Sequence, residues 1–480
     1  MTTPQVFLNS LPDRFRNWLH ETDVFLLLFL LVFSLDSVVA KPSALFLALV
    51  FLRKDIRKFR FKDAPWFYLL LPAMECIRLL FFNKDFSAGH LWSFSIGTAY
   101  WLMAYATFLI VRFRVQSHRL SAITGTLESW FFINLAVSLF QLFVVMYHSH
   151  SFNPYGLSDL AYGNSTGDFI KGVVRAPCYI NMFINSFFAV WFLFRNSWRN
   201  ALLAMLVCCL TTTNFANIIF LPILFVLLFV LKEKRARFTI LGGFGIFVLF
   251  SILFSSGNVT YLKDSMDNVS VERMTISAAD ADTSNKSFKA DSARKESARI
   301  AAIYEPIAKP NGKMLSWKET WAFASSSTVH ALFGAGMGNF SSLLAIRTAH
   351  LYGHEHSRFY EYVPQYIHPD FRANHYKIMA ALYSLPEGYH SARHMPHSFP
   401  NKILGEYGIV GVLIFIFGYV WYFLKRGAAS GFFLFVMLLT GGYLWFDYLF
   451  EYLSVMVFFE LFFWWHFFNR ANERTQRTTS

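Results

Sequence analysis

The segment between His394 and Gly411 has the residue types and spacing of a site for proton transfer beside an anion. Ser398 is a preferred residue at a helix N-terminus and Pro400 suits the first turn, so a helix is predicted to start directly after His397. The positive end of that helix favours an anion such as a phosphate. It also disfavours imidazolium, which keeps His397 neutral and able to accept a proton. His397 is therefore the candidate general base.

Glycine recurs in this segment and again upstream. The first set lies at every third position and permits close helix contact, namely Gly405, Gly408 and Gly411. The second set lies in Leu332-Phe-Gly-Ala-Gly-Met-Gly-Asn-Phe340, which follows Trp317 and Trp321.

The stretch His397-Ser-x-x-Asn-x-x-Leu-Gly-Glu-Tyr-Gly-Ile-Val-Gly411, which closes a long polar loop, resembles the bacterial O-antigen ligase and O-antigen polymerase family. The tryptophan and glycine-rich stretch upstream, the number of apolar runs and the place of the loop are also similar. The resemblance implies a metal-independent, inverting glycan transfer without a cofactor. The donor would be a glycan on undecaprenyl diphosphate, and the acceptor a hydroxyl of lipid A core or of another lipid-linked glycan.

The resemblance gives His397 the task of activating the acceptor hydroxyl and gives arginines the diphosphate. A diphosphate leaving group needs cations, and the arginine fork binds two phosphate oxygens. Arg175 resembles the family's arginine ahead of the sixth span. Arg299 competes with Lys313 and Lys318 for the cationic position before the glycine-rich stretch. The further candidates for contact with substrate are His394, Arg393, Asn214 and Glu406.

Arg78 is the second candidate for the diphosphate, after Arg175, and it has an alternative interpretation. It lies three residues after Glu75 inside an apolar run, at the spacing where two helical side chains pair. Charges inside a span are costly, so they are usually functional or paired. For Arg175 the alternative is an interfacial arginine that reaches lipid headgroups.

Histidines and tyrosines gather in the loop 257–398, which holds nine of the fifteen histidines. The segments 350–356 and 394–397 offer nitrogen ligands suited to zinc, but a helical His-Glu-x-x-His signature is absent. No metal is therefore expected. The tyrosines are expected mainly to pack the loop over the helices, with individual rings contacting sugar.

Composition decides the class of protein that must position these residues. Hydrophobic residues make up 55% of the 480, charged residues only 15%, and Phe occurs 57 times. Soluble domains carry about 25% charged residues. This excludes a soluble enzyme and a nucleic-acid-binding module, so no nucleic acid is expected as a partner. The four cysteines form no Cys-x-x-Cys pair, which excludes a disulfide-rich scaffold. The fold class is an all-α polytopic membrane protein.

Twelve apolar runs predict about twelve transmembrane helices and one large periplasmic loop. The runs are 24–40, 43–52, 64–82, 91–111, 127–147, 177–194, 200–210, 215–231, 238–256, 399–424, 429–446 and 449–468. The predicted organisation is an interfacial segment 1–22, helices one to nine over 23–256 with a periplasmic loop at 148–176, the loop 257–398, helices ten to twelve over 399–468, and a tail 469–480.

The net charge of +13 indicates orientation. The loop 257–398 contains fifteen Lys or Arg and thirteen Asp or Glu, so it accounts for only +2. Most of the excess lies in short connections such as 53–62 and 232–237, which are predicted to be cytoplasmic. Both termini then lie in the cytoplasm, and the loop faces the periplasm across a bacterial inner membrane.

Three functions remain open. A ligase and a polymerase use the same donor, and the single dominant loop resembles ligases more. A flippase or other transporter for lipid-linked oligosaccharides fits twelve spans, but transporters place polar sites near the midplane and often repeat their halves. A metal-dependent glycosyltransferase should carry an acidic pair early in an outer loop, whereas Asp36 stands alone there.

Overall fold

The computed structural model describes residues 18, 21–35, 37, 39–56, 65–82, 87–116, 119–156, 169–174, 178–211, 214–253, 312–351, 365–383, 396, 398–427 and 431–479. Within these ranges the regular secondary structure is helical and no strand occurs, which confirms the all-α prediction. Most of the predicted interfacial segment 1–22, and the first part of the long loop up to residue 311, fall outside these ranges.

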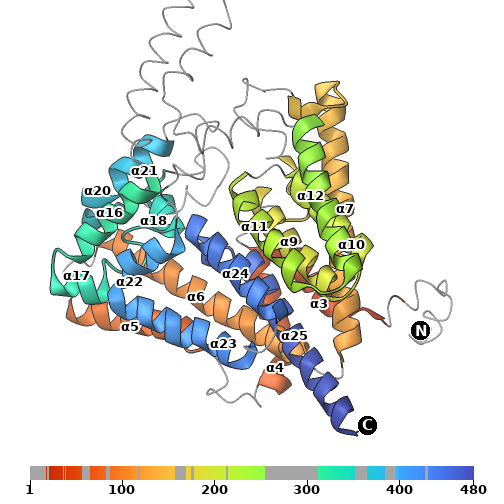
Figure 1. Ribbon diagram of the computed structural model, residues 1–480. Coiled ribbons are helices and arrows are strands. Elements are labelled where there is room, and N and C mark those ends of the chain that lie inside the picture. The colour runs from red at the N-terminus through yellow and green to blue at the C-terminus, as the bar shows by residue number, and fades with distance from the viewer. Residues whose placement is uncertain are drawn as a thin grey trace, which may run out of the picture.

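Each predicted apolar run contains a helix, and the helices gather into one bundle (Figure 1). The first nine are α3 (Val24–Ser34), α4 (Ala40–Ile56), α5 (Phe67–Phe81), α6 (Ala88–Arg114), α7 (Leu120–Ser149), α9 (Cys178–Phe194), α10 (Trp198–Leu210), α11 (Asn214–Val230) and α12 (Lys234–Leu253). The last three runs form α22 (Phe399–Phe415), continued by η5 (Ile416–Val420) and α23 (Trp421–Gly427), then α24 (Gly431–Phe446) and α25 (Leu453–Thr479).

Helix lengths support a membrane-embedded chain. Among the described residues four stretches are long and apolar enough to cross a membrane, namely Ala88–Arg114, Leu120–Ser149, Lys234–Leu253 and Phe399–Gly427. By contrast, α3 has 11 residues and α10 has 13. At about 1.5 Å per residue they reach roughly 16 and 20 Å, less than the roughly 30 Å of a bilayer core. These two helices are therefore shorter than a full membrane span.

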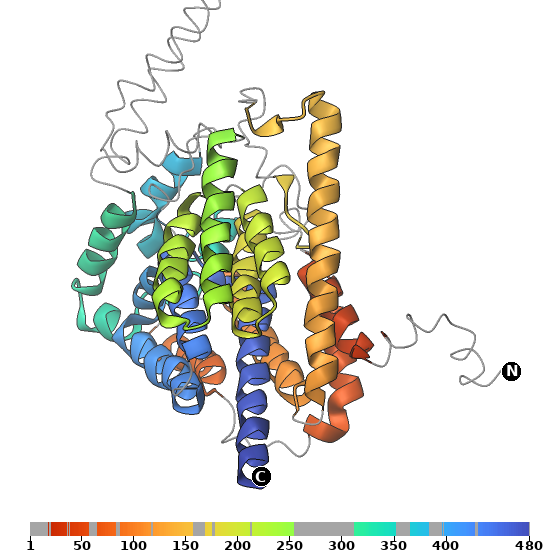
Figure 2. The ribbon, with the colours of Figure 1, turned by 45° about the vertical axis from the view of Figure 1, so that its right-hand side comes forward.

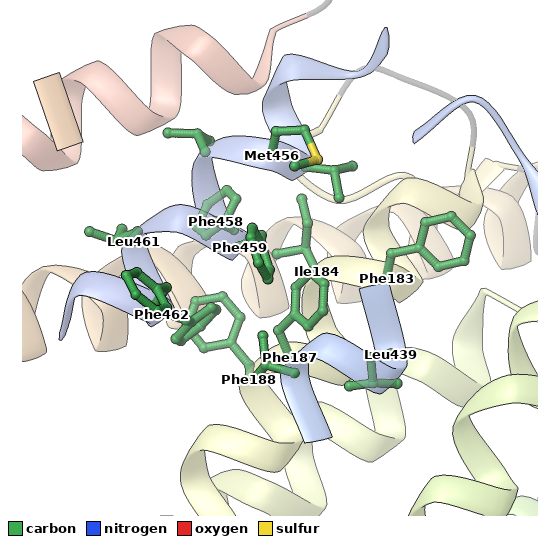
Figure 3. Close-up of a cluster of buried hydrophobic side chains, with 14 of the residues drawn as sticks. Phe183, Ile184, Phe187, Phe188, Leu439, Met456, Phe458, Phe459, Leu461 and Phe462 are labelled. Carbon is green, nitrogen blue, oxygen red and sulfur yellow. The ribbon is translucent and has the colours of Figure 1, made fainter. Parts of the chain in front are cut away.

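Aromatic packing holds the centre of the bundle. Helix α25 contacts α6, α7, α9 and α24, and its phenylalanines meet those of α9 (Figure 3). The rings of Phe188 and Phe462 lie 5.0 Å apart edge to face, and both side chains are fully buried. Such edge contacts are the preferred geometry of aromatic pairs. The high Phe content therefore supplies the interior of the bundle as well as its surface.

Short helices of the long loop pack beside the start of α22 (Figure 1). They are α16 (Gly312–Ala324), α17 (Thr328–Phe333), α18 (Leu343–Thr348), α20 (Pro369–Asn374) and α21 (Tyr376–Tyr383). Ile346, Phe371 and Met379 form a small buried cluster of their own, which also includes Tyr448 from the connection before α25. The loop is thus anchored to the last helices by a separate apolar core.

Helix α22 is not straight. Gly408 has φ of +62°, which breaks the helical backbone at that point, and a π-helical turn follows at Ile416–Val420. The three glycines were expected to serve close helix contact. Gly408 does make such a contact, since a Cβ there would lie 2.4 Å from the Leu332 backbone of α17. It also supplies a kink, because the left-handed region is cheap only for glycine.

Candidate active site

The kink in α22 is where the glycine-rich segment 332–340 attaches. The Ala335 amide donates to the Gly405 carbonyl at 2.9 Å, and the Gly336 amide donates to the Glu406 carbonyl at 2.8 Å. A left-handed residue interrupts the repeating bonds of a helix, so carbonyls in the preceding turn accept bonds from elsewhere. The two glycine-bearing segments found in the sequence are therefore one hydrogen-bonded unit.

Arg78 lies directly under this unit. Its Nη2 is 2.8 Å from Oε1 of Glu75, and its Nε is 3.0 Å from Oε2, so the predicted pairing is confirmed. Both side chains are buried. A Cβ at Gly336 would lie 2.0 Å from Nη2 of Arg78, and Gly336 has φ of +96°. The glycine is needed because the backbone passes so close to the guanidinium.

His397 itself lies outside the described residues, as do His394, Arg393, Arg175 and Arg299. Its neighbours are described. The Ser316 hydroxyl, on α16, donates to the Pro396 carbonyl at 3.3 Å and accepts from the Asn401 amide. Ser398 occupies the predicted N-cap position of α22, but its hydroxyl makes no capping bond. The chain on either side of His397 is thus held by one helix of the loop.

The remaining site candidates divide into two groups. Asn214 is the first residue of α11, and its side chain lies outside the described part. Glu406 is fully buried, and neither carboxylate oxygen has a hydrogen-bond partner within the described part of the chain. Among the described site candidates, Glu406 and Arg78 both meet Gly336, Glu406 through its carbonyl and Arg78 through its guanidinium.

Lys313 is anchored at the end of α24. Its Nζ donates to the carbonyl of Phe446 at 2.8 Å. Burial lowers the pKa of Lys313 to about 7, although the nearby Asp447 acts in the opposite direction. Lys313 thus fastens α16 to the end of α24, whereas Lys318 is exposed.

His375 and Glu319 flank Ser316 on the loop side. Nε2 of His375 lies 2.9 Å from the Ser316 carbonyl, so this nitrogen carries the proton. Burial lowers the pKa of His375 to about 4 and raises the pKa of Glu319 to about 7. Their 3.9 Å approach satisfies the distance for an ion pair. Both pKa shifts favour the neutral forms, however, so we treat this contact as one between uncharged groups.

A polar network fixes the segment just before Arg175. The Val173 amide donates to Asn134 of α7 at 2.9 Å, and the Gly172 amide donates to Gln141 of the same helix at 2.8 Å. Asn134 in turn donates to Asn181 of α9 at 2.9 Å. This network was not predicted from the sequence. Its signal was the polar spacing 134, 138 and 141 along one face of an apolar run.

A charged cavity of about 100 Å³ lies beside Glu406 and was also missed. Its wall includes Lys402 of α22, Arg347 of α18 and Glu451 of the short helix η6 (Leu449–Glu451). Nζ of Lys402 is 2.8 Å from Oε1 of Glu451, and both side chains are buried. The pairing joins residues 49 positions apart, so no helical spacing could have revealed it.

The described residues contain no cluster of three or more His, Cys, Asp or Glu side chains suited to a metal ion. Most of the histidines in the segments 350–356 and 394–397 lie outside that part. The zinc alternative is therefore untested.

Comparison with protein-family models, with curated proteins and with solved structures found no match to this chain.

Proposed function

We propose that this protein is a membrane glycan transferase of the O-antigen ligase type. The supporting observation is that the two segments carrying the resemblance, 332–340 and 398–411, are joined by backbone hydrogen bonds directly over buried Arg78. They are more than fifty residues apart, and neither needs the other to form a helix. If both segments contribute to one active site, they must lie together next to His397, and the hydrogen bonds bring them together there.

In the proposed reaction, neutral His397 takes the proton of an acceptor hydroxyl. The hydroxyl oxygen attacks the anomeric carbon of the glycan while the bond from that carbon to undecaprenyl diphosphate breaks. Attack from the opposite face inverts the configuration. No metal or cofactor takes part. Cations rather than a proton donor stabilise the departing diphosphate.

The diphosphate contacts are assigned to Arg175 and Arg299, with Arg78 as a third contributor. The charge of Arg78 is already paired by Glu75, so its part would be the smaller. His394, Arg393, Asn214 and Glu406 are proposed to contact the glycans. The acceptor is lipid A core for a ligase, or a second lipid-linked glycan for a polymerase.

The proposal includes a membrane arrangement. The chain crosses a bacterial inner membrane twelve times, both termini lie in the cytoplasm, and the loop 257–398 faces the periplasm. Membrane lipids surround the bundle. The distribution of Lys and Arg among the short connections supports this orientation.

The site is tested by replacing His397. In purified full-length protein supplied with a lipid-linked glycan and acceptor, His397→Ala should lower the transfer rate by about 100-fold or more, as loss of a general base does. His148→Ala, at an exposed histidine on α7, is the matched control and should transfer normally. Full transfer by the folded His397→Ala protein would refute the catalytic assignment.

The class of reaction is tested in a deletion strain through its lipopolysaccharide. Bare lipid A core with accumulated lipid-linked polymer indicates a ligase. Core capped by a single repeat indicates a polymerase. Accumulation of lipid-linked glycan on the cytoplasmic side indicates a transporter and contradicts the enzyme proposal.

A further inference from the structure

We propose that the charged cavity beside Glu406 is a binding site for one uncharged sugar ring of a glycan substrate. This inference rests on the proposed transfer reaction for the origin of the sugar. The site itself is inferred from the residues that line the cavity.

Glu406 supplies the first argument. Its side chain is fully buried, it lines the cavity, and both carboxylate oxygens lack a hydrogen-bond partner in the described part of the chain. The Ser342 hydroxyl and the Gly338 amide face this carboxylate, but neither reaches it with hydrogen-bond geometry. A buried carboxylate without donors is costly. Two neighbouring hydroxyl groups of a sugar would supply a donor to each oxygen.

Aromatic rings supply the second argument. Trp101 and Tyr100 of α6 line the same cavity. The indole nitrogen of Trp101 donates to the Tyr407 hydroxyl at 2.9 Å, and the Tyr100 hydroxyl donates to the Phe450 carbonyl. Their polar atoms are thus engaged with protein, and the rings are fixed. Such rings offer apolar surface to the C–H face of a sugar while Glu406 binds its hydroxyls.

Charge balance selects an uncharged ligand. Lys402 and Glu451 neutralise each other at 2.8 Å, and the same wall carries one further cation, Arg347, and one further anion, Glu406. Two cations and two anions leave no net charge. A diphosphate would meet two carboxylates, and a metal ion would meet two cations, so each would be bound less well than a neutral polyol.

Size and position agree with a single ring. The cavity volume of about 100 Å³ is several times larger than the roughly 10–15 Å³ that one water requires. It is nevertheless too small for a glycan chain. Lys402 and Glu406 lie three and seven residues after the start of α22. At about 1.5 Å per residue the cavity therefore begins within roughly 11 Å of that helix end, along the axis, where His397 precedes α22.

The first experiment measures binding without turnover. The full-length protein in lipid nanodiscs is mixed with methyl glycosides of glucose, galactose, mannose and N-acetylglucosamine, and binding is followed by saturation-transfer NMR. At least one glycoside should bind to the wild type. Glu406→Gln, which preserves shape, should weaken that binding by about tenfold or more. Ile96→Phe, which fills the cavity from α6, should remove it.

Leu102→Phe is the matched control, because it adds the same ring to an exposed position of α6. It should bind like the wild type. Three results would overturn the inference: no glycoside binds to the wild type, binding survives in folded Ile96→Phe, or inorganic diphosphate displaces the sugar competitively. The first would mean that the cavity holds water only. A thermal melt of each variant separates lost binding from lost folding.

The second experiment identifies the source of the sugar. If the ring belongs to the acceptor, Glu406→Gln should raise the KM for acceptor about tenfold and leave the KM for donor unchanged. If the ring belongs to the donor, Glu406→Gln should raise the KM for donor about tenfold and leave the KM for acceptor unchanged. Unchanged values of both would overturn the inference even if wild-type transfer is normal. Sugar binding without any transfer would instead refute the proposed function and leave the binding site intact.

Discussion

His375 and Glu319 predict opposite effects of pH on stability. Burial lowers the pKa of His375 to about 4, from about 6.5 in an unfolded chain. The stabilisation from its neutral form is complete above pH 6.5 and is lost as pH falls toward 4, by about 3 kcal/mol in total. Glu319 has a raised pKa of about 7, so its contribution is present at low pH and is lost as pH rises toward 7.

The two contributions partly cancel in the wild type, so variants must separate them. The stability difference between wild type and His375→Met should shift in favour of the variant as pH falls from 6.5 to 4.5. For Glu319→Gln the shift should favour the variant as pH rises from 4.5 to 7. Thermal unfolding of the protein in detergent across this range measures both, with exposed His148→Met as control. Parallel curves for wild type and His375→Met would contradict the assignment.

Sequence analysis predicted charge pairs between residue neighbours but not between distant residues. Glu75 and Arg78 are three residues apart on one helix, so helical geometry alone predicts their contact. Lys402 and Glu451 meet only because α22 packs beside the connection ahead of α25. That packing depends on the side chains of several helices. Glu406 was proposed as a substrate contact from its motif, while the cavity beside it required the folded chain.

The segment that enters the kink of α22 predicts a strict need for Gly336. Gly336→Ala would place a methyl group 2.0 Å from Nη2 of Arg78 at φ of +96°. The positive φ alone costs about 1–2 kcal/mol, and the clash must also displace Arg78. Both thermal stability and transfer should fall. Gly245→Ala is the control, because a Cβ there meets nothing within 4 Å and the helix gains propensity. Equal behaviour of the two variants would show that segment 335–337 is not tightly held.

The polar network between α7 and α9 predicts that Asn134 positions the segment before Arg175. Asn134→Leu leaves the Val173 amide without its acceptor, whereas the side-chain oxygen of Asn181 keeps its donor from Asn185. The loss at Val173 costs about 1–3 kcal/mol. The melting temperature should fall, and the KM for the lipid-linked donor should rise, since Arg175 follows two residues later. Leu139→Ala, at an exposed position of α7, should change neither. A destabilised variant with an unchanged donor KM would make the network purely structural.

At the level of elements, the apolar runs predicted where helices form, because each run must satisfy its backbone groups internally. They did not predict the kink at Gly408 or the packing of α16 and α17 against α22. A glycine inside an apolar run is compatible with a straight helix, with a close helix contact or with a break. The choice is made by Ala335 and Gly336, whose amides reach the freed carbonyls from another part of the chain.

The C-terminus and the start of the long loop lie at opposite ends of the bundle, as the proposed orientation requires (Figure 2). Figure 2 shows the start of α7 and the C-terminal end of α25 toward one end of the bundle, and the ends of α7 and α12 toward the other. The long loop follows α12, so its chain leaves from the end opposite the C-terminus. An even number of crossings would also bring the N-terminus to the C-terminal side. Labelling of single cysteines in a cysteine-free background tests this directly.

In spheroplasts, a membrane-impermeant maleimide should label Ser325→Cys, which is exposed between α16 and α17. Thr3→Cys and Thr478→Cys, near the two ends of the chain, should be labelled only after the membrane is permeabilised. Labelling of one terminus but not the other would require an odd number of crossings and would exclude twelve. Labelling of both termini with protection of Ser325→Cys would invert the molecule. In that case His397 would face the cytoplasm, where a periplasmic acceptor such as lipid A core on the outer leaflet could not reach it.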